Sequence, residues 1–127
     1  MNWIAALAIA IGSILGAWLR WGLGVGLNHF LPTLPLGTLV ANLLGGYLVG
    51  AAVTVFHINV ELPLEARLFF ITGFLGALTT FSTFSAEVVG LIRTEQYGWA
   101  GLAVSAHLLG SLLMTGLGIW TINRISG

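Results

Sequence analysis

The segment Gly73–Ser85 contains the residues of this chain best suited to chemistry. Its sequence, Gly-Phe-Leu-Gly-Ala-Leu-Thr-Thr-Phe-Ser-Thr-Phe-Ser, interleaves phenylalanines with small and hydroxyl residues inside an otherwise apolar stretch. A helix that only crosses lipid has no need of this composition. Backbone that leaves the helical pattern at membrane depth is tolerated where it is buried in protein or lines a watery path. The segment therefore predicts a break in a membrane helix, and we expect the function to reside there.

Phe81 and Phe84 lie three residues apart, so they share one face if the backbone after the break is helical. An aromatic ring has a positive edge, and rings presented edge-on can stabilise a small anion without a full charge. The neighbouring hydroxyl groups add hydrogen-bond donors. These hydroxyls belong to Thr79, Thr80, Ser82, Thr83 and Ser85. The pattern favours an anion site, and its alternative is a pair of core phenylalanines in a packed helix.

Main-chain carbonyls freed at the break are candidate ligands for a cation. Oxygen-only ligation suits hard ions. Because no carboxylate occurs at that point, a monovalent cation such as Na⁺ fits better than Ca²⁺ or Mg²⁺. The sequence therefore also predicts a cation site beside the anion site.

The composition places the chain in a membrane. Its 127 residues are 57% hydrophobic and only 6% charged, whereas soluble domains carry roughly 25% charged residues. The net charge of zero argues against nucleic acid as a partner. The absence of cysteine excludes disulfides and thiolate metal sites. No nucleophile–base pair, phosphate loop or acidic cluster is present, so we expect a protein that is not an enzyme.

Four segments are long and apolar enough to cross a bilayer, which takes about 20 residues. They run over Trp3–Leu27, Leu36–Phe56, Leu64–Ile92 and Trp99–Ile122. The connections are Asn28–Pro35, His57–Pro63 and Arg93–Gly98. We therefore predict an all-α integral membrane protein in which residues 1–127 form a single four-span domain. The pairs Gly12/Gly16 and Gly46/Gly50, and the series Gly22, Gly24 and Gly26, put small residues on helix faces, which favours close helix packing in lipid.

The arginines are divided almost evenly between the two sides of the membrane. Four spans place the termini and the second connection together, with Arg67 and Arg124; Arg93 and Arg20 lie toward the other side. Short loops normally show a clear Lys/Arg excess on the cytoplasmic side. One interpretation is a weakly specified single topology. The other is insertion in both orientations with pairing into an antiparallel homodimer, which the inverted repeats of many transport proteins favour.

Polar residues follow one face of the second span and one face of the fourth. Thr38, Asn42 and Gly45 share a face of the second span by their spacing. The stripe on the fourth span consists of His107, Ser111, Thr115 and Gly118. Helix–helix hydrogen bonds and bonds back to the helix backbone are the alternatives to a polar path. Together with the break in the third span, the two stripes predict a narrow hydrated track.

Two charged residues, Arg20 and Glu87, are candidates for the membrane interior, whereas Glu65 and Arg67 fall at the start of the third span. Arg20 occurs near the end of the first span, flanked by Trp18 and Trp21. It is either an interfacial arginine that reaches the headgroups or a positive charge at the mouth of an anion path. Glu87 follows the break by a few residues, and it either faces a vestibule or pairs with a base such as Arg20.

Over its whole length the chain resembles the Fluc-type (CrcB) bacterial fluoride channels. The resemblance rests on Gly16–Arg20, Gly37–Asn42, Gly73–Ser85 with Glu87, and the Ser111/Thr115 stripe; its most specific part is the Thr-Phe-Ser-Thr-Phe sequence of Thr80–Phe84. It implies a fluoride-selective channel of the bacterial inner membrane that exports F⁻ passively and relieves fluoride toxicity. It also implies an antiparallel homodimer with two pores.

The same resemblance implies roles for individual residues. The pore residues would be Phe81, Phe84, Asn42, Thr38, Ser82, Thr83, Ser111 and Thr115. Arg20 and Glu87 would lie in the vestibule. The carbonyls of Gly76 and Thr79 from both subunits would hold a central structural Na⁺.

The main competing interpretation is a small multidrug transporter, which also has four spans and often dual topology. Such transporters use a glutamate embedded in the first span, where this chain has Arg20; its mid-span acid, Glu87, is in the third. A third class, a structural or assembly protein, has no need of the concentrated break.

Overall fold

The computed structural model describes residues 2–127, which are helical with short connections and contain no strand. The first two spans are α1 (Trp3–Leu27) and α2 (Leu36–Ile58), joined through a short 3₁₀ turn, η1 (Asn28–Phe30). The third span is divided into α3 (Leu64–Arg67), the π-helical η2 (Leu68–Leu75), α4 (Gly76–Leu78) and α5 (Phe81–Arg93). The fourth span is α6 (Tyr97–Ser126).

The prediction of four membrane-capable helices is confirmed. The four helical stretches Trp3–Phe30, Leu36–Ile58, Leu64–Arg93 and Tyr97–Ser126 are long and apolar enough to cross a membrane. The bounds of α1 agree with the prediction, while α6 extends beyond the predicted Trp99–Ile122 at both ends. The extension follows because Tyr97, Gly98 and the residues after Ile122 include no proline to end the helix.

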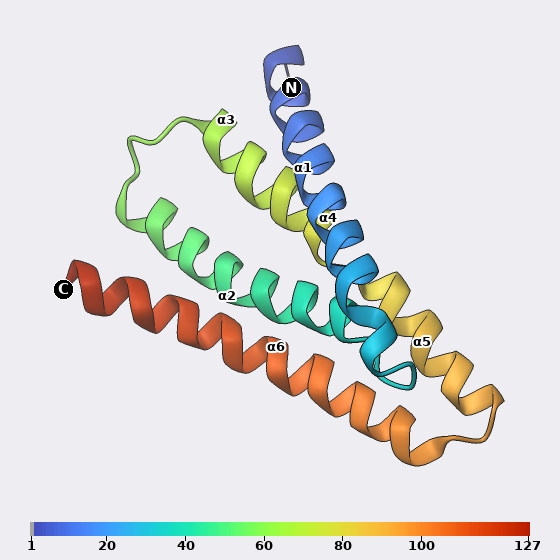
Figure 1. Cartoon of the computed structure of the whole chain (residues 1–127). Helices are drawn as coiled ribbons and strands as arrows, with labels where there is room; N and C mark the ends of the chain where they lie inside the picture. The colour runs from blue at the N-terminus through green and yellow to red at the C-terminus, as the bar shows by residue number, and fades with distance from the viewer. Residues whose placement is uncertain (1) are drawn as a thin grey trace.

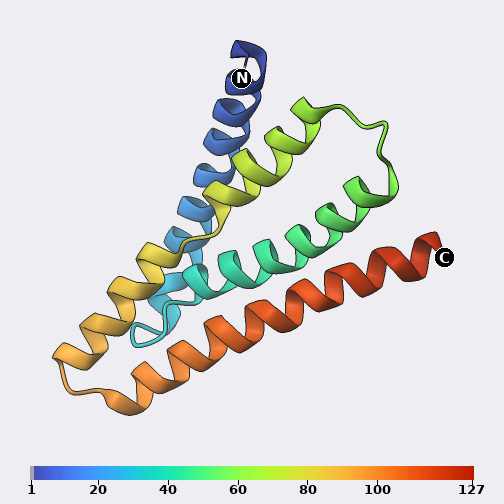
Figure 2. The same ribbon diagram turned by 180° about the vertical axis from the view of Figure 1, so that it is seen from behind.

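The third span connects two groups of helices, since its first half packs with α1 and its second half packs with α6. α1 packs along η2 and α4, α2 runs beside α6, and α5 turns away to lie against α6 (Figures 1 and 2). The two termini and the α2–α3 connection lie at one end of the molecule, and the other two connections lie at the opposite end (Figure 1). This is the sidedness that four spans predict.

Glycines allow the closest helix contacts. An added Cβ on Gly12 would overlap the Phe69 carbonyl, and one on Gly16 would overlap that of Phe74, so α1 meets the third span through its backbone. Gly50 likewise lies against the Thr115 backbone on α6. The prediction of close packing at Gly12/Gly16 and Gly46/Gly50 is confirmed. A Cβ added to Gly22 or Gly26, by contrast, would meet no atom of the described residues within 4 Å beyond its own stretch of helix.

Asn28 connects the end of α1 to the start of α2. Its side-chain oxygen Oδ1 accepts hydrogen bonds from the backbone N–H groups of Gly37 at 2.7 Å and Thr38 at 3.2 Å. These first N–H groups of a helix have no intrahelical partner. The side chain therefore caps α2 from across the connection and fixes the segment that carries Thr38 and Asn42.

Candidate functional site

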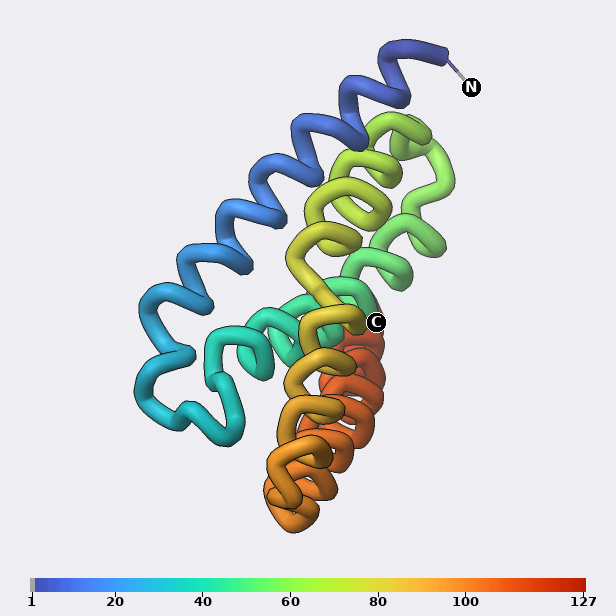
Figure 3. Tube along the Cα trace, turned by 90° about the vertical axis from the view of Figure 1, so that its right-hand side faces the viewer, coloured from blue at the N-terminus to red at the C-terminus, as the bar shows by residue number. Residues whose placement is uncertain are grey.

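Two residues of extended backbone separate α4 from α5. Thr79 has φ −83° and ψ 152°, and Thr80 has φ −149° and ψ 108°. Figure 3 shows the trace running straight between the two helical parts of the third span. The Thr80 side chain starts the new helix, because its Oγ1 accepts a hydrogen bond from the Thr83 N–H at 3.1 Å in the manner of a helix N-cap.

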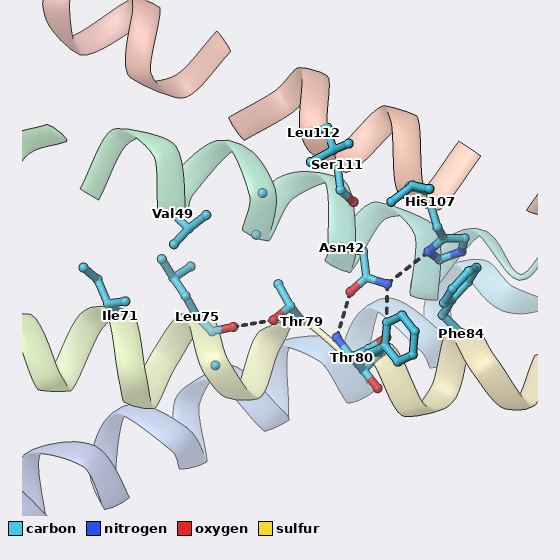
Figure 4. A pocket seen from close by; sticks show the side chains of 15 residues that line it. Asn42, Val49, Ile71, Leu75, Thr79, Thr80, Phe84, His107, Ser111 and Leu112 are labelled. Carbon is cyan, nitrogen blue, oxygen red and sulfur yellow. Dashed lines mark hydrogen bonds between the residues drawn. The ribbon is translucent and has the colours of Figure 1, made fainter. Parts of the chain in front are cut away.

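Asn42 on α2 binds the backbone of Thr80 at two points. Its Oδ1 accepts from the Thr80 N–H at 2.7 Å, and its Nδ2 donates to the Thr80 carbonyl at 3.2 Å (Figure 4). The same Nδ2 lies 3.0 Å from His107 Nδ1 on α6. One side chain thus links three of the four spans at the point where the third span is extended.

A cleft of about 390 Å³ lies between α2, the third span and α6. Asn42, Thr80, Phe84 and His107 gather near one end of it, and Val49, Ile71 and Leu75 line the rest (Figure 4). The predicted residues that line this cleft are Asn42, Gly76, Thr79, Phe81, Phe84 and Ser111. The structure thus brings part of each stripe, Asn42 with Gly45 and His107 with Ser111, and the extended segment to one cavity.

Phe81 and Phe84 meet edge to face. Their ring centroids are 5.5 Å apart with an interplanar angle of 66°, so the positive edge of one ring points at the face of the other. Phe84 also packs on the His107 imidazole, with centroids 4.6 Å apart. Phe81 is 78% exposed in the single chain, so one chain leaves the aromatic wall of the cleft open.

A second cleft, of about 340 Å³, lies on the α1 side of Thr80. It is lined by Arg20, Thr38 and Thr83 among others, and Thr80 lines both clefts. Arg20 Nε donates to the Ala77 carbonyl at 2.9 Å, so the arginine lies against the last turn of α4. A positive charge and three hydroxyl residues therefore border this cleft.

Glu87 lies beside α2. Its Oε2 accepts from the Thr38 hydroxyl at 2.7 Å, and its Oε1 is buried without a partner among residues 2–127. Arg20, which the sequence offered as a partner, donates to the Ala77 carbonyl instead.

Two other predicted pore residues lie outside both cleft linings. Thr115 donates its hydroxyl to the Gly46 carbonyl on α2 at 3.0 Å, so this hydrogen bond joins two helices. Ser82 is exposed, and its Oγ lies 3.4 Å from Thr80 Oγ1. Within a single chain these two hydroxyls therefore contribute to neither cavity.

The carbonyls of Gly76 and Thr79 fit the predicted cation site. In a continuous α-helix the Thr80 N–H would donate to the Gly76 carbonyl and the Thr83 N–H to the Thr79 carbonyl. Here those two N–H groups donate to Asn42 Oδ1 and Thr80 Oγ1. Both carbonyls lose their usual helical donors, and neutral oxygens of this kind suit a hard monovalent cation.

Sequence reasoning gave no position-specific role to Thr80 or His107, and it missed Asn28 as a cap. The signal for Thr80 is its residue type, since threonine is a preferred N-cap whose hydroxyl accepts from the N–H three residues later. In this helix that N–H belongs to Thr83. His107 was recognised only as part of a stripe. Its bond to Asn42 joins residues 65 positions apart, and no local pattern reports such a contact.

Comparisons with known proteins place this chain among named relatives. The family described as "CrcB-like protein, Camphor Resistance (CrcB)" matches residues 7–119. A protein of Nitrosospira multiformis named "Fluoride-specific ion channel FluC" is 62% identical over 126 residues, which cover 99% of this chain and 98% of that protein. Proteins of the same name from Cupriavidus necator and Tolumonas auensis are each 57% identical, with 99% and 95% of this chain covered and 100% and 95% of theirs.

Proposed function

This chain belongs to the CrcB-like family, as its resemblance to that family predicted, and from this premise we propose that it is a fluoride-selective ion channel. The observation that carries the proposal is the cleft at Thr79–Phe84, which combines aromatic edges, amide and hydroxyl groups in a chain 62% identical to a protein named as a fluoride-specific channel. Because the named relatives are ion channels, the expectation that the chain is not an enzyme agrees with the family.

The chemistry of the cleft supports a small, strongly hydrated anion. Fluoride loses its hydration shell only where donors replace the water, because an unpaired buried charge is very costly. The edge-to-face pair Phe81 and Phe84 offers positive ring edges, and the Ser111 hydroxyl adds a hydrogen-bond donor. These groups are neutral, so they stabilise an anion without holding it as strongly as a salt bridge, which favours rapid exit.

The two clefts suggest the route. Since Thr80 borders both, we propose that fluoride enters past Arg20 and passes Thr38 and Thr83 before reaching the phenylalanines. Arg20 raises the local anion concentration at the entrance by its charge.

We propose that two copies pair in antiparallel fashion and form two pores. Two observations support this assembly. The arginines are nearly balanced between the sides, and Phe81 in the aromatic wall of the cleft is 78% exposed. A second chain would cover the open side of the aromatic wall and complete each pore.

The freed carbonyls support a structural Na⁺. We propose that Gly76 and Thr79 from both copies would hold it where the two third spans meet. Such an ion would satisfy the main-chain oxygens, which are costly to leave unpaired in a low-dielectric interior, and would add positive charge beside the anion path.

The physiological role we propose is passive export of fluoride across the inner membrane of a bacterium. A channel without a coupling reaction lets fluoride leave down its electrochemical gradient and so relieves the cell of accumulated ion. The four membrane-capable helices support a multi-pass location.

A flux assay in liposomes tests the proposal. Purified protein in vesicles loaded with fluoride, chloride or a lipophilic cation should release fluoride alone, on addition of an ionophore that balances charge. Release of the lipophilic cation would point to the multidrug transporter class instead. Absence of any release above protein-free vesicles would contradict a transport function.

A further inference from the structure

The orientation of the Asn42 amide is fixed by a backbone donor. The Thr80 N–H lies 2.7 Å from one terminal atom of the Asn42 side chain, and a backbone N–H can only donate, so that atom is the acceptor Oδ1. The other atom is therefore Nδ2, which carries two N–H groups. It lies 3.2 Å from the Thr80 carbonyl and 3.0 Å from His107 Nδ1. Both N–H groups of Asn42 are thus committed within the protein.

This orientation determines where the proton of His107 lies. Nδ2 of Asn42 has no lone pair to offer, so His107 Nδ1 must accept and cannot carry hydrogen. A neutral imidazole has a single N–H, which is then on Nε2. A proton on Nδ1 would place two donors opposite each other at 3.0 Å.

The remaining N–H of His107 is free. His107 is only 4% exposed, and its Nε2 has no partner among residues 2–127. In Figure 4 the bond from Asn42 meets one ring nitrogen, and the other lies on the far side of the ring. Phe84 covers the imidazole from α5, and Glu87 is one turn further along that helix. The free N–H therefore belongs to the buried wall of the site.

We propose that Asn42 is a positioning residue for His107. Its two hydrogen bonds to the Thr80 backbone fix the orientation of the Asn42 amide. The Asn42 amide nitrogen then fixes the tautomer of His107 in which Nε2 carries the hydrogen. His107, rather than Asn42, then carries the ring N–H that no residue among 2–127 accepts. The part of this inference that concerns conduction rests on the proposed function, whereas the tautomer does not.

Nitrogen NMR of the full chain labelled with ¹⁵N-histidine tests the tautomer directly. The chain has three histidines, and the signal of His107 is identified by its loss in H107N. In the wild type we expect hydrogen on Nε2 and a bare Nδ1. N42D replaces the donor Nδ2 by an oxygen that only accepts, so hydrogen should move onto Nδ1 of His107.

A matched control uses Asn59, another asparagine whose side-chain amide donates to a backbone carbonyl. Asn59 caps the end of α2 through a bond from its Nδ2 to the Val55 carbonyl at 2.9 Å, and N59D should leave the His107 signal unchanged. A wild-type spectrum with hydrogen on Nδ1 overturns the inference even if N42D does not fold. An unchanged tautomer in folded N42D overturns it as well.

Fluoride efflux separates the inference from the proposed function. N42D should lose efflux by about tenfold or more, where each tenfold step corresponds to about 1.4 kcal/mol of barrier. If the wild type shows no efflux while its His107 spectrum is as expected, the channel proposal fails and the tautomer assignment stands. If the wild type conducts and N42D conducts equally well, the positioning role in conduction is overturned.

Discussion

The polar side chains around Thr80 form most of their hydrogen bonds with backbone groups. Thr80 Oγ1 caps α5, Asn42 binds both the N–H and the carbonyl of Thr80, and Thr79 returns its hydroxyl to the Leu75 carbonyl at 2.9 Å. These bonds satisfy the N–H and the carbonyl of Thr80, whereas the carbonyls of Gly76 and Thr79 are left without their usual helical donors. The groups that remain for ions are the ring edges and the Ser111 hydroxyl for an anion, and these two carbonyls for a cation.

At Phe84 we expect the ring itself to matter for conduction. F84I keeps a large apolar side chain but removes the positive ring edge and the contact with His107. Fluoride efflux from liposomes should fall by about tenfold or more, equivalent to about 1.4 kcal/mol of barrier. F81I should behave similarly, because the two rings form one edge-to-face pair.

The control for these variants is F70I. Phe70 stacks on Phe74 with centroids 5.6 Å apart and lines neither cleft, so F70I should conduct like the wild type. Gel filtration shows whether each variant keeps its assembly. If F84I and F81I release fluoride as fast as the wild type, the two rings contribute to packing and not to conduction.

Arg20 should contribute to stability as well as to anion entry. Its Nε donates to the Ala77 carbonyl, and lysine cannot reproduce that bond with its flexible point charge. R20K and R20Q should each lose about 1.5–3 kcal/mol of unfolding free energy, the range for a hydrogen bond to a charged group. Efflux should be lower in R20Q, because only R20K keeps the charge. If the midpoint of thermal unfolding in detergent is the same in R20K and the wild type, the hydrogen bond from Arg20 to the Ala77 carbonyl is contradicted.

At the scale of elements, the third span carries most of the function. α1 contacts it through backbone at Gly12 and Gly16, on the opposite side from the cleft. The first half of the third span is π-helical over Leu68–Leu75, and π-helical segments are often found at functional sites. The close contact with α1 therefore holds the segment just before the extended residues.

Filling that contact should destabilise the fold. G12A places a methyl group where the Phe69 carbonyl lies, and forcing extra volume into a packed contact costs about 1–3 kcal/mol. G22A is the matched control, since Gly22 lies on the same helix and its added methyl group would enter open space. The midpoint of thermal unfolding should fall in G12A and stay or rise in G22A. Equal midpoints would show that the α1 contact is loose.

The elements could be predicted from the sequence far better than the contacts within the site. Span length and apolar composition locate the helices, and the hydroxyl cluster locates the segment where Thr79 and Thr80 are extended. The π-helix could not be predicted, because Leu68–Leu75 is almost entirely apolar and has no local signal. The partners of Asn42, Glu87 and Thr115 depend on how spans pack, so spacing alone left them open.

At the scale of the whole molecule, the proposal of antiparallel pairing predicts labelling from both sides of the membrane. The chain has no cysteine, so T33C in the first connection gives one reporter. An impermeant thiol reagent should label part of the protein in intact cells and the remainder only after the membrane is opened. Labelling of all copies from one side would establish a single topology and contradict the pairing.

The proposed Na⁺ predicts that assembly and flux depend on the monovalent cation. Replacing Na⁺ by a larger organic cation should slow fluoride efflux or lower the thermal midpoint of the dimer, because the carbonyls of Gly76 and Thr79 would lose their ligand. T79V should have a smaller effect than Na⁺ removal, since the proposed ligand is the main-chain oxygen. Indifference of both flux and stability to Na⁺ would argue against the site.

The central claim is that this chain conducts fluoride selectively and passively. The most direct measurement is the reversal potential of the purified protein in a planar bilayer, with opposing gradients of fluoride and chloride at equal pH. We predict a current that reverses at the fluoride equilibrium potential and is greatly reduced in F84I. Reversal at the chloride potential, or a potential that follows an imposed proton gradient, would contradict a passive fluoride channel.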